Sequence, residues 1–226
     1  MSLLFIHGAG ASPLVWRLQL MHFKDALAVD LLGHPNGTGC ENIEEYAASV
    51  EDYIKTTAAK YPILVGHSMG GAIAITLALR HPDLTGLVLV GTGARLRVHP
   101  ELLSKINENY EEASRLIARW SVAPSSDPII ADRIAREMLR VNPNVTYGDF
   151  MACDKFDYMN DVSRIICKTL IIVGADDKMT PVKYSDYLHE KIVNSKLCVI
   201  PSAGHSVMLE KHRAFNDALR AFLDSL

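Results

Sequence analysis

The stretch Ile63-Leu64-Val65-Gly66-His67-Ser68-Met69-Gly70-Gly71-Ala72 decides how the rest of the chain is interpreted. Three apolar residues that predict a buried strand run into a G-x-S-x-G pattern, and small residues typical of a close-packed helix follow. This strand–turn–helix context distinguishes a nucleophilic serine from a glycine-rich turn with an incidental serine. Gly66 and Gly70 leave room for a sharp turn that lifts the hydroxyl of Ser68 above the sheet. We therefore predict that Ser68 is a nucleophile.

The same type of apolar run recurs along the chain and predicts a parallel sheet. Runs that read as buried strands lie at Leu3–Ile6, Ala26–Val29, Ile63–Val65, Leu87–Val90, Leu170–Val173 and Leu197–Ile200. They lack the polar–apolar alternation of half-exposed strands, which is typical of strands covered on both faces. Amphipathic helices are predicted between most of them, at about Ile43–Lys60, Gly70–Arg80, Pro181–Lys191 and Val207–Leu226. Repeated strand–helix–strand units predict an α/β fold with about six mostly parallel strands flanked by helices.

One segment breaks this rhythm and predicts an insertion. From Arg95 to Arg164 the pattern is helical, with no convincing strand. Within it, Asp127-Pro128 predicts a helix start with an N-cap and a first-turn proline, and Asn142-Pro143 predicts the end of that helix. We expect a core made of residues 1–94 and 165–226, with residues 95–164 inserted as a helical cap.

Length, charge and cysteine usage narrow the class of protein. The 226 residues suffice for one compact domain that buries its own core. A net charge of −3, with basic and acidic residues interleaved, gives no reason to expect a nucleic-acid partner. No apolar run approaches the roughly 20 residues of a membrane span, and no signal-peptide pattern is visible. The four cysteines are scattered without a CxxC pair, so we expect free thiols and a cytoplasmic protein.

A serine hydroxyl is a poor nucleophile without a base, and His205 is the best candidate for that base. It lies in Ala203-Gly204-His205-Ser206, between the last predicted strand and the last predicted helix. Loops that follow strands gather at the carboxyl ends of an open parallel sheet, where Ser68 is also expected. His67 is the neighbour of Ser68, but we expect its side chain to turn away from the nucleophile.

The histidine needs a carboxylate that fixes its tautomer and stabilises its charge. The segment Gly174-Ala175-Asp176-Asp177-Lys178 follows a predicted strand and offers two adjacent carboxylates. Either one gives the chain order Ser, Asp, His. Residue chemistry alone does not choose between Asp176 and Asp177, and the one that is not used is expected to be a turn residue.

A reaction of this kind also needs two donors for a developing oxyanion. One is expected to be the backbone N–H of Met69, next to Ser68. The other is expected to come from His7-Gly8-Ala9-Gly10, after the first strand, and we choose the N–H of Ala9. Position 13 is proline, so the glycines do not continue as a dinucleotide-binding G-x-G-x-x-G pattern. No metal-ligand spacing is present either, and we expect no metal and no cofactor.

With these motifs in place, the chain resembles the α/β-hydrolase superfamily over nearly its whole length. The branch is similar to small capped esterases, cofactor-free haloperoxidases and C–C bond hydrolases. The matching pieces are His7-Gly8, Val29 to His34, Gly66 to Gly71, Gly174 to Pro181 and Gly204-His205. The family's spacing from glycine to acid to proline matches Gly174, Asp177 and Pro181. The resemblance therefore implies Asp177 as the acid.

The chain departs from the family at two places. The loop Gly91-Thr92-Gly93 carries no acid, so the alternative acid position of some relatives is empty. Relatives usually begin with a β-hairpin before the His-Gly loop, which we expect to be absent here. Ala26–Val29 is then expected to lie at the edge of the sheet. Either the flanking charges of Lys24, Asp25 and Asp30 protect this edge in a monomer, or a homodimer forms through it, and we predict the homodimer.

Together these residues predict a serine hydrolase of the carboxylesterase type, acting on small to medium uncharged esters through a Ser68 acyl-enzyme. Most of the apolar residues of the cap are expected to pack it on the core, and a few of them are expected to line the acyl pocket; they are Leu103, Ile106, Trp120, Ile130, Met138, Phe150 and Met159. The same three residues would serve perhydrolysis, as in a haloperoxidase, or C–C bond cleavage, and a ligand-binding receptor that retains them is a further alternative.

Overall fold

A computed structural model, which describes residues 2–57 and 62–226, contains one six-stranded sheet. The strands are β1 (Leu3–Ile6), β2 (Ala26–Val29), β3 (Ile63–His67), β4 (Leu87–Val90), β5 (Thr169–Gly174) and β6 (Ser195–Ile200). Their order is β2-β1-β3-β4-β5-β6, and every pair is parallel. The predicted α/β class and the predicted edge position of β2 are confirmed.

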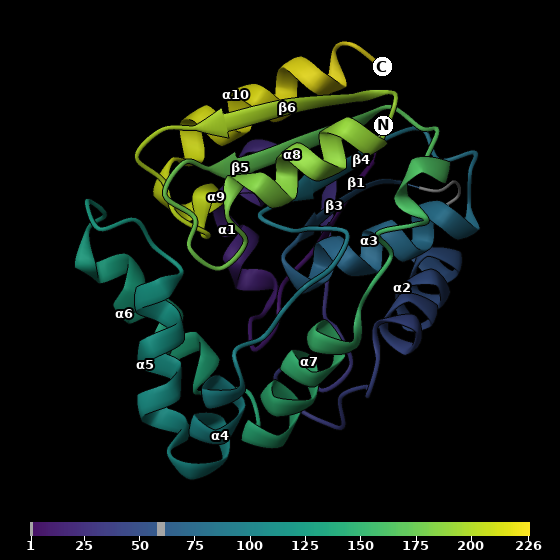
Figure 1. Cartoon of the computed structure of the whole chain (residues 1–226). Coiled ribbons are helices and arrows are strands. Elements are labelled where there is room, and N and C mark those ends of the chain that lie inside the picture. Colours follow the sequence, from purple (N-terminus) through teal and green to yellow (C-terminus); the bar gives the residue numbers. More distant parts are fainter. Residues whose placement is uncertain (1, 58–61) are drawn as a thin grey trace.

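Helices cover both faces of this sheet (Figure 1). One face carries α2 (Ile43–Thr57), α3 (Met69–Arg80) and α8 (Val182–Lys191), and the other carries α1 (Arg17–His22), α9 (Val207–Glu210) and α10 (His212–Leu223). Short 3₁₀ turns lie at Pro13–Trp16 and Val162–Arg164. The carboxyl ends of all six strands point the same way, so the loops after them meet at one edge of the sheet.

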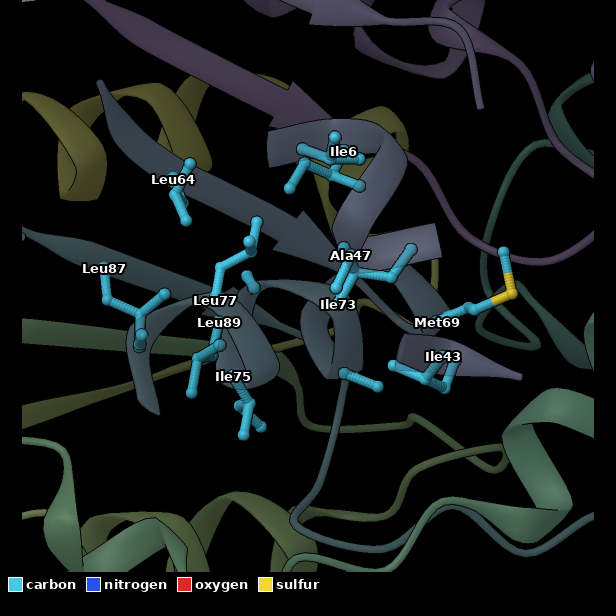
Figure 2. Close-up of a cluster of buried hydrophobic side chains, with 14 of the residues drawn as sticks. Ile6, Ile43, Ala47, Leu64, Met69, Ile73, Ile75, Leu77, Leu87 and Leu89 are labelled. Atoms are coloured by element: carbon cyan, nitrogen blue, oxygen red, sulfur yellow. The ribbon is translucent and has the colours of Figure 1, made fainter. Parts of the chain in front are cut away.

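The apolar residues of the strands supply both cores, because successive side chains point to opposite faces. In β1, Leu4 and Ile6 face α2 and α3, whereas Leu3 and Phe5 face α1 and α10. Figure 2 shows the first of these clusters, in which strand and helix side chains interdigitate. Both clusters include residues just beyond the carboxyl ends of the strands, namely Leu31 and Met69 in the first and Ala203 in the second.

Two helix boundaries differ clearly from the sequence predictions, and a third cannot be compared. The last helix is two helices, because Lys211 leaves the helical conformation, with φ −127° and ψ 48°. Asn142 begins a helix rather than ending one, because its side chain accepts a hydrogen bond from the Asn144 N–H and caps that helix. Residues 58–60 of the predicted first long helix lie outside the described residues.

The chain between β4 and β5 forms four helices: α4 (Pro100–Glu108), α5 (Tyr110–Trp120), α6 (Pro128–Met138) and α7 (Pro143–Lys155). Asp127 caps α6 as predicted. Helices α4 to α6 lie below the sheet in Figure 1 and share an apolar cluster with α7. Helix α7 also packs on the main core through Ala152 and Cys153. The division into a core and a cap at residues 95–164 stays a prediction.

Two further features concern membrane-spanning helices and the cysteines. In the described part of the chain, no helix is long and apolar enough to cross a membrane. The four cysteines are free thiols, as predicted, and three of them are buried.

Candidate active site

Ser68 occupies a strained turn between β3 and α3. Its φ of 53° and ψ of −118° lie in a region that side-chain-bearing residues rarely adopt. The flanking glycines are sterically required: a Cβ on Gly66 would lie 2.2 Å from the Gly70 carbonyl oxygen, and one on Gly70 would lie 2.3 Å from the Ile6 carbonyl oxygen. The local sequence therefore holds the Ser68 hydroxyl at the amino end of a helix.

His205 and Asp177 meet at the carboxyl edge of the sheet, from the loops after β6 and β5. The Nδ1 atom of His205 lies 2.8 Å from Oδ2 of Asp177, and both side chains are buried. Asp176 is exposed and its backbone N–H donates to the Ala203 carbonyl oxygen at 2.8 Å. The structure thus brings Asp177, and not its neighbour, to the histidine.

The Asp177 carboxylate is held by more than the histidine. Its Oδ1 accepts the backbone N–H groups of Met179 and Thr180 at 2.9 Å each, and its Oδ2 accepts the Thr180 hydroxyl at 2.9 Å. Burial raises the pKa of Asp177, but the charge of His205 and these hydrogen bonds outweigh it and hold the pKa below its ordinary value. Sequence reasoning missed Thr180, although a Thr-Pro pair just after the aspartate was a visible signal.

Gly91, at the end of β4, leaves room for this pair. Its φ is +48°, and a Cβ there would lie 3.2 Å from Nδ1 of His205 and 3.3 Å from Oδ2 of Asp177. Gly91 thus lies directly beside the His205–Asp177 contact, where any side chain would be close to both residues.

His67 lies against the ring of His205, with 4.6 Å between the ring centroids. Its Nε2 is 3.1 Å from the His205 carbonyl oxygen, an acceptor, so Nε2 carries the hydrogen. Burial and the neighbouring His205 lower the pKa of His67 to about 3, so the ring is neutral. The sequence led us to expect that the His67 side chain turns away from Ser68; in the structure its ring packs against the ring of His205.

The loop after β1 lies against the nucleophile, because a Cβ on Gly8 would be 3.1 Å from the Ser68 Cβ. Nδ1 of His7 is 2.9 Å from the Gly8 carbonyl oxygen, and Nε2 of His7 accepts the Leu31 N–H at 3.4 Å. Burial and the nearby His34 lower the pKa of His7 to about 3, so His7 is neutral and donates from Nδ1.

This donation fixes one peptide plane. The Gly8 carbonyl and the Ala9 N–H belong to the same trans peptide and point in opposite directions. Anchoring the carbonyl on His7 therefore also fixes the direction of the Ala9 N–H. Among the described residues, neither the Ala9 N–H nor the Met69 N–H has a hydrogen-bond acceptor. Both donors remain available for a ligand.

A cavity of about 280 Å³ opens beside these groups. Ser68 and His205 line it together with the loop after β1 and with residues of the inserted helices α5, α6 and α7. The lining is mainly apolar and includes Val15, Ile117, Ile134, Met138 and Phe150, but three charged residues, Arg17, Arg133 and Glu137, also line it. Within residues 2–57 and 62–226, no three His, Cys, Asp or Glu side chains gather in an arrangement that would hold a metal ion.

Two carboxylates that sequence reasoning missed tie the inserted helices to the site. Glu210, on α9, accepts the Gly204 N–H at 2.9 Å and the Ala123 N–H at 2.8 Å, and it also accepts the Ser126 hydroxyl. It thereby joins the loop of His205 to the α5–α6 loop. Asp149, on α7, accepts the Gly10 N–H. Neither residue stands in a recognisable motif.

Comparison with known proteins shows which family and fold this chain resembles. Residues 3–218 match the family described as "Alpha/beta hydrolase family". The chain is similar to the pimeloyl-[acyl-carrier protein] methyl ester esterase of Neisseria meningitidis serogroup A, with 29% identity over 98% of this chain and 76% of that protein. It is also similar to the (E)-2-((N-methylformamido)methylene)succinate hydrolase of Acinetobacter baylyi, with 22% identity over 99% and 90% of the two chains.

Among solved structures, a thermophilic esterase shares 39% identity with a TM-score of 0.88, covering 99% of this chain and 89% of that one. An esterase from Exiguobacterium antarcticum, at 18% identity, has a TM-score of 0.92 and covers 99% and 92%. The second likeness concerns the fold alone.

Proposed function

Because the chain belongs to the alpha/beta hydrolase family and is of the esterase type, we propose that it is a serine carboxylesterase. Ser68 is the nucleophile, His205 the general base and Asp177 the acid that orients the histidine. The observation that carries this proposal is the 2.8 Å contact between His205 Nδ1 and Asp177, beside the cavity that Ser68 lines. That contact leaves Nε2 of His205 as the atom that takes the serine proton.

The reaction proceeds in two halves. Ser68 Oγ attacks the ester carbonyl carbon while His205 takes its proton, and the N–H groups of Ala9 and Met69 stabilise the oxyanion. His205 then protonates the leaving alcohol, and an acyl-enzyme remains. Water, deprotonated by the same histidine, attacks the acyl-enzyme and releases the carboxylic acid and Ser68.

The cavity supports small to medium uncharged esters as substrates. Most of its lining is apolar, which favours burial of an acyl chain because apolar surface is removed from water. By their names, one relative is an esterase of a pimeloyl-[acyl-carrier protein] methyl ester, which supports an ester as the substrate, and another is a hydrolase of a substituted succinate. The four free thiols support the cytoplasm as the compartment.

Turnover of p-nitrophenyl esters of increasing acyl length tests this function. We expect multiple turnovers, and Ser68→Ala or His205→Ala should lower kcat by about 10⁴-fold or more while thermal unfolding stays close to wild type. The double variant should be little worse than either single one, because the residues act as a unit. Mass spectrometry should find the acyl adduct on Ser68.

Two outcomes would count against the proposal. Near-normal ester turnover by Ser68→Ala would remove the serine mechanism. A single stoichiometric burst with no further turnover would instead favour a receptor that retains the three residues.

A further inference from the structure

The mechanism above does not use the buried carboxylate of Asp149. Asp149 lies on α7 and is fully buried. Its Oδ2 accepts the Gly10 N–H at 2.8 Å and lies 2.8 Å from Nε2 of His34, and its Oδ1 accepts the Tyr46 hydroxyl at 2.6 Å. These three partners come from the loop after β1, the loop after β2 and helix α2. A carboxylate of this kind is retained only where its hydrogen bonds are satisfied.

The partners of His34 show that this carboxylate is paired with a cation. Nε2 of His34 faces Asp149, and Nδ1 is 3.0 Å from the Leu32 carbonyl oxygen. Both ring nitrogens face acceptors, so both carry hydrogens and the ring is an imidazolium. Burial alone would lower the pKa of His34, but the hydrogen bond and the charge of Asp149 raise it above its ordinary value.

Asp149 acts on the loop of the oxyanion donor from the side opposite to His7. The Gly10 N–H belongs to the peptide that follows Ala9, whereas the Gly8 carbonyl belongs to the peptide that precedes it. His7 fixes the preceding peptide and Asp149 fixes the following one. Gly10 has a φ of +60°, and a glycine at this position would let the loop adopt other conformations if the anchor were absent.

We propose that Asp149 is a positioning residue for the ester hydrolysis described above, on which this inference rests. Its carboxylate holds the Gly10 amide and thereby keeps the Ala9 N–H directed at the oxygen that becomes negative in the transition state. The hydrogen bond from the Ala9 N–H to this oxygen is stronger in the transition state than in the bound ester, because the oxygen gains negative charge there. Losing it should therefore reduce kcat and leave KM nearly unchanged.

Three substitutions separate this role from general support of the fold. Asp149→Leu keeps the branched shape and removes the acceptor for Gly10. Asp149→Asn keeps an acceptor oxygen that can face Gly10, so it should recover most of the lost activity. Tyr46→Phe is the matched control, because it removes the hydrogen bond to Oδ1 of the same carboxylate and leaves the bond to Gly10.

The measurements are kcat per titrated active site, KM, and the inhibition constant of a trifluoromethyl ketone. The Ser68 oxygen adds to the carbonyl carbon of the ketone while His205 takes the serine proton. The ketone oxygen becomes an alkoxide, which the oxyanion donors stabilise. For Asp149→Leu we expect kcat to fall by about tenfold or more, toward the 10²–10³-fold that loss of a donor costs. The inhibition constant should rise in parallel, KM should change less than twofold, and Tyr46→Phe should keep kcat within about twofold.

Several results would overturn the proposal. Normal kcat per titrated site in Asp149→Leu would mean that the residue only supports folding, and an equal loss in Tyr46→Phe would mean that the whole buried network matters rather than the Gly10 bond. If Asp149→Leu does not fold, Asp149→Ser, whose hydroxyl stops short of Gly10, gives the same measurements. Failure of the esterase proposal itself would be visible separately, as absence of turnover in the wild-type protein.

Discussion

At the end of β5, two adjacent aspartates meet opposite environments. Asp177 is 5% exposed and accepts hydrogen bonds from two backbone amides, a threonine hydroxyl and His205. Asp176 is exposed, and its side chain has no hydrogen bond among the described residues. Only a carboxylate that is itself held rigidly can hold the imidazole in one tautomer and orientation.

This contrast leads to a prediction about the two aspartates. Asp177→Asn should lower kcat/KM by about 10³–10⁴-fold, because an amide would favour the wrong tautomer of His205. Asp176→Asn, the matched control one residue away, should stay within about twofold of the wild type. Steady-state kinetics on one p-nitrophenyl ester measures both. A larger loss in Asp176→Asn would show that Asp176, and not Asp177, orients His205, which would contradict the prediction.

The site residues differ in how far local sequence could reveal them. Ser68 was predictable because its strained turn needs glycines at fixed spacing on either side, and His205 because it follows the last strand. Asp149 was not predictable, since its bond to Gly10 spans 139 residues of sequence and its neighbours on α7 form an ordinary helix. Contacts of this kind depend on the tertiary packing of the inserted helices, which no local pattern specifies.

At the scale of elements, the six strands were predictable because each contains a short apolar run. The four inner strands β1, β3, β4 and β5 are buried throughout, whereas the edge strands β2 and β6 are partly exposed. The helix ends were less so. The apolar periodicity of the last helix continues through Lys211, although the backbone leaves the helix there. Asn142 was ambiguous because an Asn-Pro pair both ends one helix and caps the next. Which of the two happens depends on whether the side-chain oxygen finds an N–H of the following turn.

Strand β2 is an exposed edge strand that could pair with a second copy of the protein. It lies at one edge of the sheet, and within the described part of the chain it pairs with β1 alone. Leu27, in its middle, is 42% exposed. An edge strand with an exposed apolar side chain presents backbone donors and acceptors to a second chain. We therefore propose that two copies of the protein associate through β2.

Charge placed on this edge should separate the copies. Leu27→Lys would bring two like charges together in a symmetric pair and should shift the mass found by light scattering from dimer to monomer. Val199→Lys is the matched control, because Val199 is also 42% exposed and lies on β6, the opposite edge. A wild-type protein that is monomeric at all workable concentrations would rule the interface out, and dissociation by Val199→Lys alone would move it to β6.

For the molecule as a whole, two buried neutral histidines link folding to pH. The pKa values of His7 and His67 are each lowered to about 3, by burial first and then by neighbouring histidines. The unfolded chain takes up protons at these histidines near pH 6.5, whereas the folded chain does not. Their contribution to stability is therefore complete above pH 6.5 and is lost as the pH falls toward 3.

The free energy of unfolding should accordingly fall as the pH is lowered from 7 to 5, by up to about 1.4 kcal/mol per pH unit for each of these histidines. His67→Gln removes one of them and keeps an N–H donor, so its slope should be shallower. His99→Gln, at an exposed histidine, should leave the slope unchanged. Urea unfolding at pH 7, 6 and 5 measures this, and parallel lines for wild type and His67→Gln would refute it.

The bonds of Asp149 and Glu210 have a consequence for protein engineering. Because α7 and the α5–α6 loop each carry one end of a hydrogen bond to the loops of the site, the inserted helices are not an exchangeable module. A chimaera that takes the whole segment from a relative must keep an acceptor for the Gly10 N–H and a donor for Glu210, which also holds Gly204. Otherwise we expect kcat to fall in addition to any change in substrate selectivity. Helix α6, which reaches the cavity through Ile134 and Met138 and makes neither bond, is the better place for a library that retunes acyl-chain preference.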